Sequence, residues 1–219
     1  SGTSTYTIAG SFTMDQGGSF TYASTTVIMN ATTTGKTITT SGGQEITFNT
    51  LRFTGVGGGW NINGDIRAQN GISVENGTVS GTANVTVLGG SLSGNGTVSM
   101  GGGTTTVATT NTLGGTALWT FNNLVLGNGI IVGTTTAATN ATTTILGRLT
   151  IGAAHTFSLG GAHIDLRGSG TVFAESGVFL EGTSTVRYSG TTGSQVLSTT
   201  YHNLELMALG NAPTFTGSG

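Results

Sequence analysis

The sequence contains no cysteine, a single proline and few charged residues. Six Lys and Arg stand against eight Asp and Glu among 219 residues. Without cysteine, the chain has no disulfides, no thiolate catalysis and no Cys-ligated zinc. The net charge of −2 at pH 7 gives no electrostatic footprint for nucleic acid or for an anionic membrane surface. We therefore expect neither of these partners.

Long hydrophobic runs are also missing. No stretch approaches the roughly 20 apolar residues of a membrane-spanning helix. Residues 1–6 lack the basic and apolar regions of a secretory signal. We expect a soluble mature segment or an excised fragment with no membrane span. Sparse charge, abundant Thr, Gly and Asn, and a single lysine, Lys36, favour an extracellular or cell-surface location.

Glycine and apolar residues are plentiful instead. The chain has 40 Gly, and 35% of its residues are hydrophobic while only 6% are charged. A typical globular domain has about 7% Gly and about 25% charged residues. Gly and Thr both disfavour helices, whereas the apolar residues suffice for a core. The composition predicts an all-β protein.

Apolar residues recur every six to eight residues in two stretches of the chain. In the first stretch, three intervals lead from Ile66 to Val85. In the second stretch the intervals are slightly longer, and three of them lead from Leu149 to Val172. The recurring positions are Ile66, Ile72, Val79, Val85, Leu92 and Val98, and then Leu149, Phe157, Ile164, Val172, Phe179 and Val186. This spacing fits neither a helical period nor the common helical repeats.

Around these positions apolar and polar residues alternate, as in Val85-Thr86-Val87, which is typical of short strands with one buried face. We predict one domain over residues 1–219, a parallel β-helix (β-solenoid) with about 20–22 residues in each three-strand coil. Right-handed crossovers are the general rule, although some three-sided solenoids are left-handed. A β-sandwich subunit with donor-strand exchange is the alternative, but it leaves the spacing unexplained. The glycines expected at the corners, where bends need positive φ, are Gly71, Gly77, Gly81, Gly89, Gly90, Gly94 and Gly96.

A longer repeat lies over the short one. An aromatic-x-x-Leu-x-apolar pattern begins at Phe48, Phe121 and Tyr201. An apolar-x-Gly-x-apolar pattern surrounds Gly10, Gly64 and Gly147. We interpret these markers as internal copies of a module. The copies cover approximately residues 1–47 (partial), 48–120, 121–200 and 201–219 (partial).

Three threonine-rich segments lack the apolar spacing. They cover residues 31–40, 104–112 and 134–144. We predict that they are loops or irregular strands that leave the solenoid. The last segment fits an insertion, because the interval from Phe121 to Gly147 is ten residues longer than that from Phe48 to Gly64.

Charged residues gather in one region. His163, Asp165 and Arg167 alternate with apolar residues, so all three should point out of one strand. Further acidic and basic residues follow at Glu175, Glu181 and Arg187. Carboxylates of this kind could serve a lyase or glycosidase or hold Ca²⁺. We favour the simpler interpretation, solvent-side ion pairs on stacked strands, and assign no catalytic, cofactor or metal residue.

Exposed aromatic rings can stack on sugars. For Trp60, Trp119 and Tyr201 we instead predict packing in the core or at module junctions, because they lie near the module markers.

The sequence resembles the β-strand-repeat, haemagglutinin-like surface proteins of bacteria. The likeness rests on Phe121-Asn122-Asn123-Leu124 and on the Gly-Thr-Val units at 96–98 and 170–172. It implies a right-handed parallel β-helix in an adhesin, sheath or surface filament, and it gives no catalytic residues. Our leading hypothesis is a non-enzymatic structural component of an extracellular filament, sheath or cell-surface stalk. Such a component would be a homopolymer or part of a longer repeat chain. The alternatives are an adhesin shaft that contacts glycans and a polysaccharide lyase or glycosidase that uses Asp165, Glu175 and Glu181.

Overall fold

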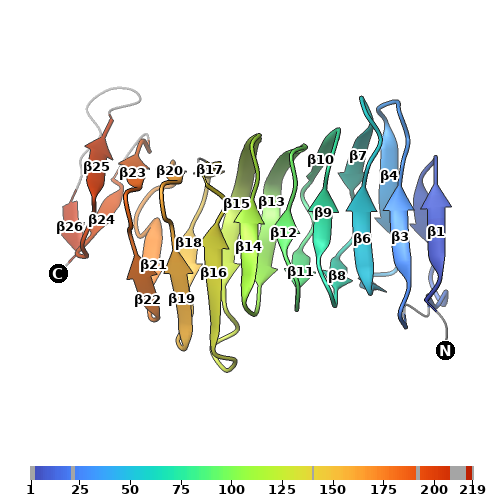
Figure 1. Cartoon of the computed structure of the whole chain (residues 1–219), viewed down its shortest axis with the longest axis horizontal. Coiled ribbons are helices and arrows are strands. Elements are labelled where there is room, and N and C mark those ends of the chain that lie inside the picture. The colour runs from blue at the N-terminus through green and yellow to red at the C-terminus, as the bar shows by residue number, and fades with distance from the viewer. Residues whose placement is uncertain (1–2, 21–22, 140, 191–192, 208–215, 219) are drawn as a thin grey trace.

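The computed structural model describes residues 3–20, 23–139, 141–190, 193–207 and 216–218. It is an all-β solenoid whose coils follow one another along a single axis (Figure 1). Every strand pair in these ranges is parallel, as in Val79↔Val98. The parallel β-helix is therefore confirmed, and the β-sandwich alternative is wrong.

The first face of the solenoid is a sheet of nine strands in the described part of the chain. Its strands, in spatial order, are β1 (Thr5–Ile8), β3 (Thr26–Met29), β6 (Thr50–Phe53), β9 (Ile72–Val74), β12 (Leu92–Ser93), β14 (Asn111–Gly114), β16 (Gly133–Ala137), β19 (His155–Ser158) and β22 (Val178–Leu180).

The second face carries the next strand of each coil. Its order is β2 (Phe12–Met14), β4 (Lys36–Thr40), β7 (Gly59–Ile62), β10 (Thr78–Gly81), β13 (Thr97–Val107), β15 (Leu118–Leu126), β17 (Thr142–Ile145), β20 (His163–Leu166), β23 (Thr185–Tyr188) and β25 (Asn203–Leu206).

The third face begins with β5 (Ile46–Phe48), β8 (Ile66–Ala68) and β11 (Val85–Val87), and it continues with β18 (Leu149–Ile151) and β21 (Phe173–Glu175). Between these two groups lie the second halves of β13 and β15, which join the second face to the third. A separate pair, β24 (Gln195–Leu197) and β26 (Thr216–Ser218), follows near β21.

The coil is right-handed. In Figure 1 the strands of the first face lie toward the viewer and point upward, and those of the second face lie behind. The chain meanwhile advances from the right-hand N-terminus to the left-hand C-terminus. This agrees with the usual hand of parallel crossovers.

Inward-facing side chains stack in columns along the axis. The predicted positions Val79 and Val98 are directly paired, and so are Ile164 and Val186. Leu149 pairs with Phe173, one residue beyond the predicted Val172.

Coil length varies more widely than predicted. The coil between the paired residues Val186 and Leu204 is shorter than predicted. The coil between the paired residues Phe12 and Ile38 is longer than predicted. The register between coils is therefore kept while the number of residues in each coil changes.

The two tryptophans belong to this core, as predicted. Trp119 is fully buried and Trp60 is 1% exposed. Tyr201 is half-buried, and its hydroxyl lies 2.8 Å from that of Tyr188.

The strands in the described parts of the threonine-rich segments belong to the solenoid sheets, so the prediction of loops or irregular strands that leave the solenoid was wrong. The segments contain β4, nearly all of β16 and β17, the end of β13 and the first half of β14. The apolar spacing is hidden there because threonine itself takes inward positions. Thr105 and Thr143 are buried between apolar neighbours in their columns. Threonine is β-branched and suits strands. The longer connection lies instead at residues 127–132, before β16.

The corner glycines serve two purposes. Five of the seven predicted residues have positive φ, namely Gly71, Gly77, Gly81, Gly90 and Gly94. Gly89 and Gly96 do not; a side chain there would instead crowd the previous coil, with a Cβ at Gly89 only 2.6 Å from the Gln69 carbonyl oxygen. Close approach between coils thus requires glycine even where φ is ordinary.

The two longer-repeat markers relate differently to the coils. Phe48 lies on the third face and Phe121 in a column of the second, so the coil register does not align them. Ile62 and Ile145 do share one column, and Gly64 and Gly147 follow them at the same corner. The module boundaries stay a prediction.

A test of close approach compares two glycines that lack positive φ. A Cβ at Gly115 would lie 1.6 Å from the Gly94 carbonyl oxygen, whereas one at Gly101 meets nothing within 4 Å. We expect Gly115→Ala to lower the free energy of unfolding by about 3 kcal/mol and Gly101→Ala to leave it nearly unchanged. Urea denaturation followed by circular dichroism measures both. Equal effects of the two substitutions would contradict this packing.

Candidate functional site

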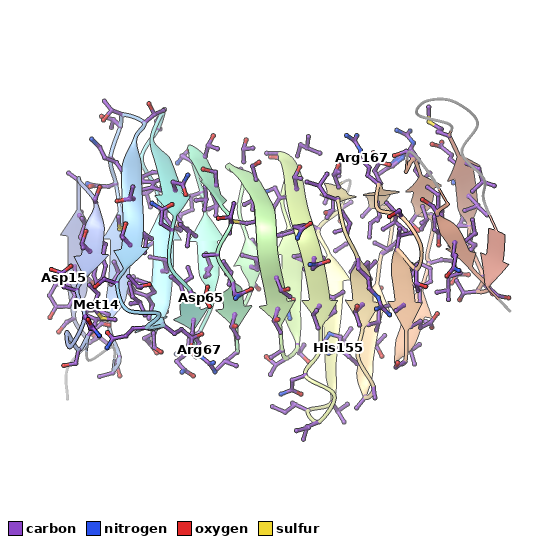
Figure 2. The ribbon with its side chains drawn as sticks, turned by 180° about the vertical axis from the view of Figure 1, so that it is seen from behind. Met14, Asp15, Asp65, Arg67, His155 and Arg167 are labelled. Atoms are coloured by element: carbon purple, nitrogen blue, oxygen red, sulfur yellow. The ribbon has the colours of Figure 1, made fainter. Side chains whose placement is uncertain are left out.

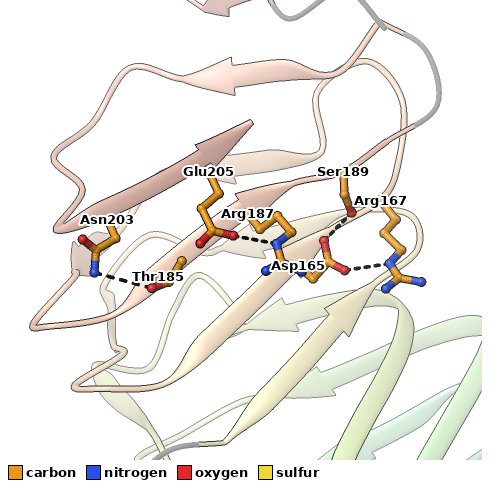
Figure 3. Close-up of polar contacts among 7 residues, drawn as sticks. All are labelled: Asp165, Arg167, Thr185, Arg187, Ser189, Asn203 and Glu205. Carbon is orange, nitrogen blue, oxygen red and sulfur yellow. Dashed lines mark hydrogen bonds and ion pairs between the residues drawn. The ribbon is translucent and has the colours of Figure 1, made fainter. Parts of the chain in front are cut away.

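The charged cluster predicted from the sequence lies on the second face. Asp165 stacks directly beneath Arg187, and Arg187 stacks beneath Glu205. Arg187 pairs with Glu205 at 2.7 Å, and Arg167 pairs with Asp165 at 2.7 Å (Figure 3). The hydrogen bond to Glu205 raises the pKa of Arg187 further above its usual range.

Asp165 differs from the expected solvent-facing residue. It is only 5% exposed because neighbouring side chains cover it. The Ser189 hydroxyl and the Arg167 guanidinium both donate hydrogen bonds to its carboxylate. A carboxylate held in this way is a structural acceptor that joins β20 to the following coil.

The three carboxylates of the enzyme hypothesis lie on different faces. Asp165 is on β20 of the second face, while Glu175 is on β21 of the third and accepts the backbone N–H of Phe179 at 3.0 Å. Glu181 follows β22 of the first face. The structure does not bring these groups to one cleft. Among the described residues there is also no group of three or more His, Asp or Glu that could hold a metal ion.

Ion pairs elsewhere also join neighbouring coils. Arg52 pairs with Glu75 at 2.7 Å and Arg67 with Glu45 at 2.8 Å. All these side chains are about one-third exposed or more, and exposed pairs contribute on the order of 0–1 kcal/mol each. Their arrangement is that of solvent-side pairs on stacked strands.

A ladder of Asp and Asn side chains at the corner before the third face was not predicted. Asp65 accepts both the backbone N–H of Asn84, at 2.9 Å, and its side-chain amide, at 3.0 Å. Asn84 in turn accepts the N–H of Thr104 in the next coil at 2.9 Å. Asn123 repeats the contact with the N–H of Arg148 at 3.0 Å. In Figure 2, Asp65 lies near Arg67 at this edge. Each side chain satisfies an amide one coil further along.

Sequence reasoning missed this ladder because its members follow the coil register and not a fixed interval. Successive coils place positions 65, 84, 104, 123 and 148 at this corner, and the last step is clearly longer than the others. The available signal was the Asp or Asn that stands just before Ile66, Val85 and Leu124, the first inward residues of the third face in their coils.

His155 fills a niche inside the solenoid near the first face. It is 1% exposed, and its Nε2 lies 2.8 Å from the Thr135 hydroxyl. It stacks on Gly133 of the preceding coil, and because glycine has no side chain there is room for the ring. Nδ1 has no partner in the described structure. Figure 2 labels its place near the long connection. Burial lowers the pKa of His155 below its usual 6.5.

The connection between β15 and β16, which lies beside His155, presents aliphatic side chains to solvent. The Asn128 side chain accepts the N–H groups of Ile130, at 3.0 Å, and Ile131, at 2.8 Å. Ile130 is 84% exposed and Val132 81%. The turn therefore holds an apolar tip outside the core.

Comparison with known proteins gives no assignment. No protein-family model, curated protein or solved structure matches the chain. Among the described residues no helix is long and apolar enough to cross a membrane.

Removing one rung of the Asp–Asn ladder tests its contribution. Asn84→Ala loses the two side-chain hydrogen bonds, to Asp65 and from the Thr104 N–H, and keeps the backbone bond to Asp65. We expect the free energy of unfolding to fall by about 1–2 kcal/mol. Asn63→Ala is the control, since this exposed side chain makes no hydrogen bond with the described residues. Urea denaturation distinguishes the two; an Asn84 variant as stable as the control would show that water replaces the ladder at no cost.

The buried histidine predicts a pH dependence. Because the folded pKa of His155 lies below 6.5, the unfolded chain binds the proton more readily. The His155 contribution to stability is therefore complete above about pH 6.5 and is lost as the pH falls below it. Thermal unfolding at pH 7.5 and 5.5 should show a larger loss for the wild type than for His155→Gln. Parallel losses in both proteins would exclude His155 as the source.

Proposed function

We propose that this chain is a structural segment of an extracellular filament, sheath or cell-surface stalk. It assembles through its solenoid ends and strand edges, either with further coils of a longer chain or with copies of itself. The single observation that supports the proposal is that side chains in the core columns are exposed at both ends of the solenoid.

At each end, side chains in core columns are exposed. Tyr6 is 51% exposed, although its column neighbour Val27 is fully buried. At the other end Leu204 is 42% and Leu206 49% exposed, above the buried Val186 and Tyr188. Within the described residues no strand pairs with the outer edges of β1 and β25.

A further coil would complete these columns. It would remove Tyr6 or Leu204 and Leu206 from water and pair the free backbone groups of the edge strand. Repeat solenoids are stabilised by such nearest-neighbour contacts, and bare ends favour stacking. The low charge along the sides offers little repulsion to close packing.

The enzyme alternative gains no comparable support, because Asp165, Glu175 and Glu181 lie on separate faces. The proposed extracellular location rests on composition.

Assembly through the ends can be tested at Leu206. We expect the wild type to form end-to-end fibres in negative-stain images and concentration-dependent species in sedimentation velocity. Leu206→Glu should shift both readouts toward monomer because a charge would be buried at the junction. Leu118→Glu is the matched control, since Leu118 is 51% exposed but lies on the side of the solenoid.

Two outcomes would contradict the proposal. Wild-type protein that stays monomeric across salt and protein concentration would exclude self-assembly through the ends. An equal effect of Leu118→Glu would place the contact on the side of the solenoid.

A further inference from the structure

Five asparagines in this chain are followed directly by glycine. They are Asn63, Asn70, Asn76, Asn95 and Asn128. In such a pair the glycine backbone nitrogen can attack the asparagine side-chain carbon, because glycine has no side chain to block the approach. The attack requires the backbone between the two residues to rotate. The fold therefore decides which of the five pairs can react.

Two of the asparagines are tied to the previous coil by their own amides. Asn70 donates its backbone N–H to the Asn49 carbonyl at 2.7 Å and its side-chain amide to Asn49 Oδ1 at 2.6 Å. The Asn76 side-chain amide donates to the Thr54 carbonyl at 3.2 Å. Rotation at either corner would break bonds between coils.

Two further pairs are held through their glycines. The Gly96 N–H, next to Asn95, already donates to the Val74 carbonyl at 2.7 Å, so this nitrogen is not free to attack. Gly64, next to Asn63, is buried, and a Cβ there would lie 1.9 Å from the Thr40 hydroxyl oxygen. Backbone packed this closely against another coil cannot turn without disturbing that coil.

The pair Asn128–Gly129 is different. It lies in the connection 127–132, outside the strands, and both residues are exposed. A Cβ at Gly129 would meet nothing within 4 Å. Neither the Gly129 N–H nor the Asn128 side-chain NH2 has a hydrogen-bond partner among the described residues. The attacking nitrogen and the leaving nitrogen are therefore both free.

The Asn128 side-chain oxygen is also held by donors. Ile130 and Ile131 donate their backbone N–H groups to Oδ1 at 3.0 and 2.8 Å. When a nitrogen attacks the adjacent Cγ, this oxygen takes up the negative charge of the tetrahedral intermediate. Backbone N–H groups directed at such an oxygen stabilise that charge. The turn thus combines a free nucleophile with a polarised amide.

We propose that Asn128 is a site of spontaneous deamidation. The Gly129 nitrogen bonds to Cγ of Asn128 while the bond from Cγ to the side-chain nitrogen breaks. That nitrogen leaves as ammonia, with the proton that Gly129 gave up through solvent. Water then adds to one of the two carbonyl carbons of the succinimide ring and opens it to aspartate or isoaspartate. Water is consumed and ammonia released, without oxidation or reduction.

The product changes the character of the connection. Deamidation adds one negative charge to a chain of net charge −2. The new carboxylate stands beside Ile130 and Val132, which are 84% and 81% exposed. An apolar tip therefore becomes charged with time, while the strands on either side keep their residues. This chemistry does not depend on the proposed assembly.

The first test compares the folded chain with the chain unfolded in guanidinium, both incubated at pH 7.5. Chymotryptic peptide mapping by mass spectrometry follows the replacement of NH2 by OH at each site. We expect all five asparagines to react at similar rates in the unfolded chain. In the folded chain Asn128 should react at least as fast as when unfolded. The other four should be slowed about ten-fold or more, because each needs local opening of a corner.

The second test removes one donor. Ile131→Pro lacks the N–H that bonds Asn128 Oδ1, whereas Ile131→Ala is the matched control that keeps it. Deamidation of folded Ile131→Pro should be several-fold slower than that of folded Ile131→Ala, and the two should react equally in guanidinium. Circular dichroism confirms that both variants fold.

Two results would overturn the proposal. One is a folded wild-type chain in which Asn128 reacts no faster than the four corner asparagines. The other is equal deamidation of the two Ile131 variants in the folded state, because the backbone donors would then contribute nothing to the reaction.

Discussion

The parallel register between coils is the constraint on which the rest of this structure depends. Each strand must meet its neighbours on both sides at a spacing of about 4.8 Å, so every coil has to return to the same columns whatever its length. The columns tolerate very different side chains: Gly81 stands between Ile62 and Met100, and Thr143 between Trp119 and Ile164. Every residue of such a column points inward, whatever its size.

Register also explains where the polar groups lie. Backbone amides at corners fall outside the ladders, and side chains of the adjacent coil accept them, as Asp65 and Asn84 do. The same geometry brings opposite charges together on the outer surface, as in Arg187 and Glu205. Many polar contacts of this solenoid therefore run along the axis, from coil to coil. Each coil depends on its neighbours for both its core and its corners.

Much of the fold could be predicted from the sequence, because alternation and apolar spacing report directly on inward positions. The prediction failed where threonine replaced an aliphatic residue inside, as at Thr105 and Thr143, since periodicity cannot distinguish a buried threonine from a solvated one. The sites were harder to foresee. Asp165 alternates as a surface residue would, yet Ser189, in the following coil, covers it.

The connection that carries Ile130 has six residues, 127–132, between β15 and β16, whereas residues 108–110 and 152–154, three each, suffice in the coils before and after. The columns on either side keep their pairing across this difference. Extra chain at this corner is absorbed outside the core, without a change of pitch. The solenoid is therefore a scaffold with fixed positions along its axis. A peptide grafted at one corner would be displayed at a position set by the coil that carries it.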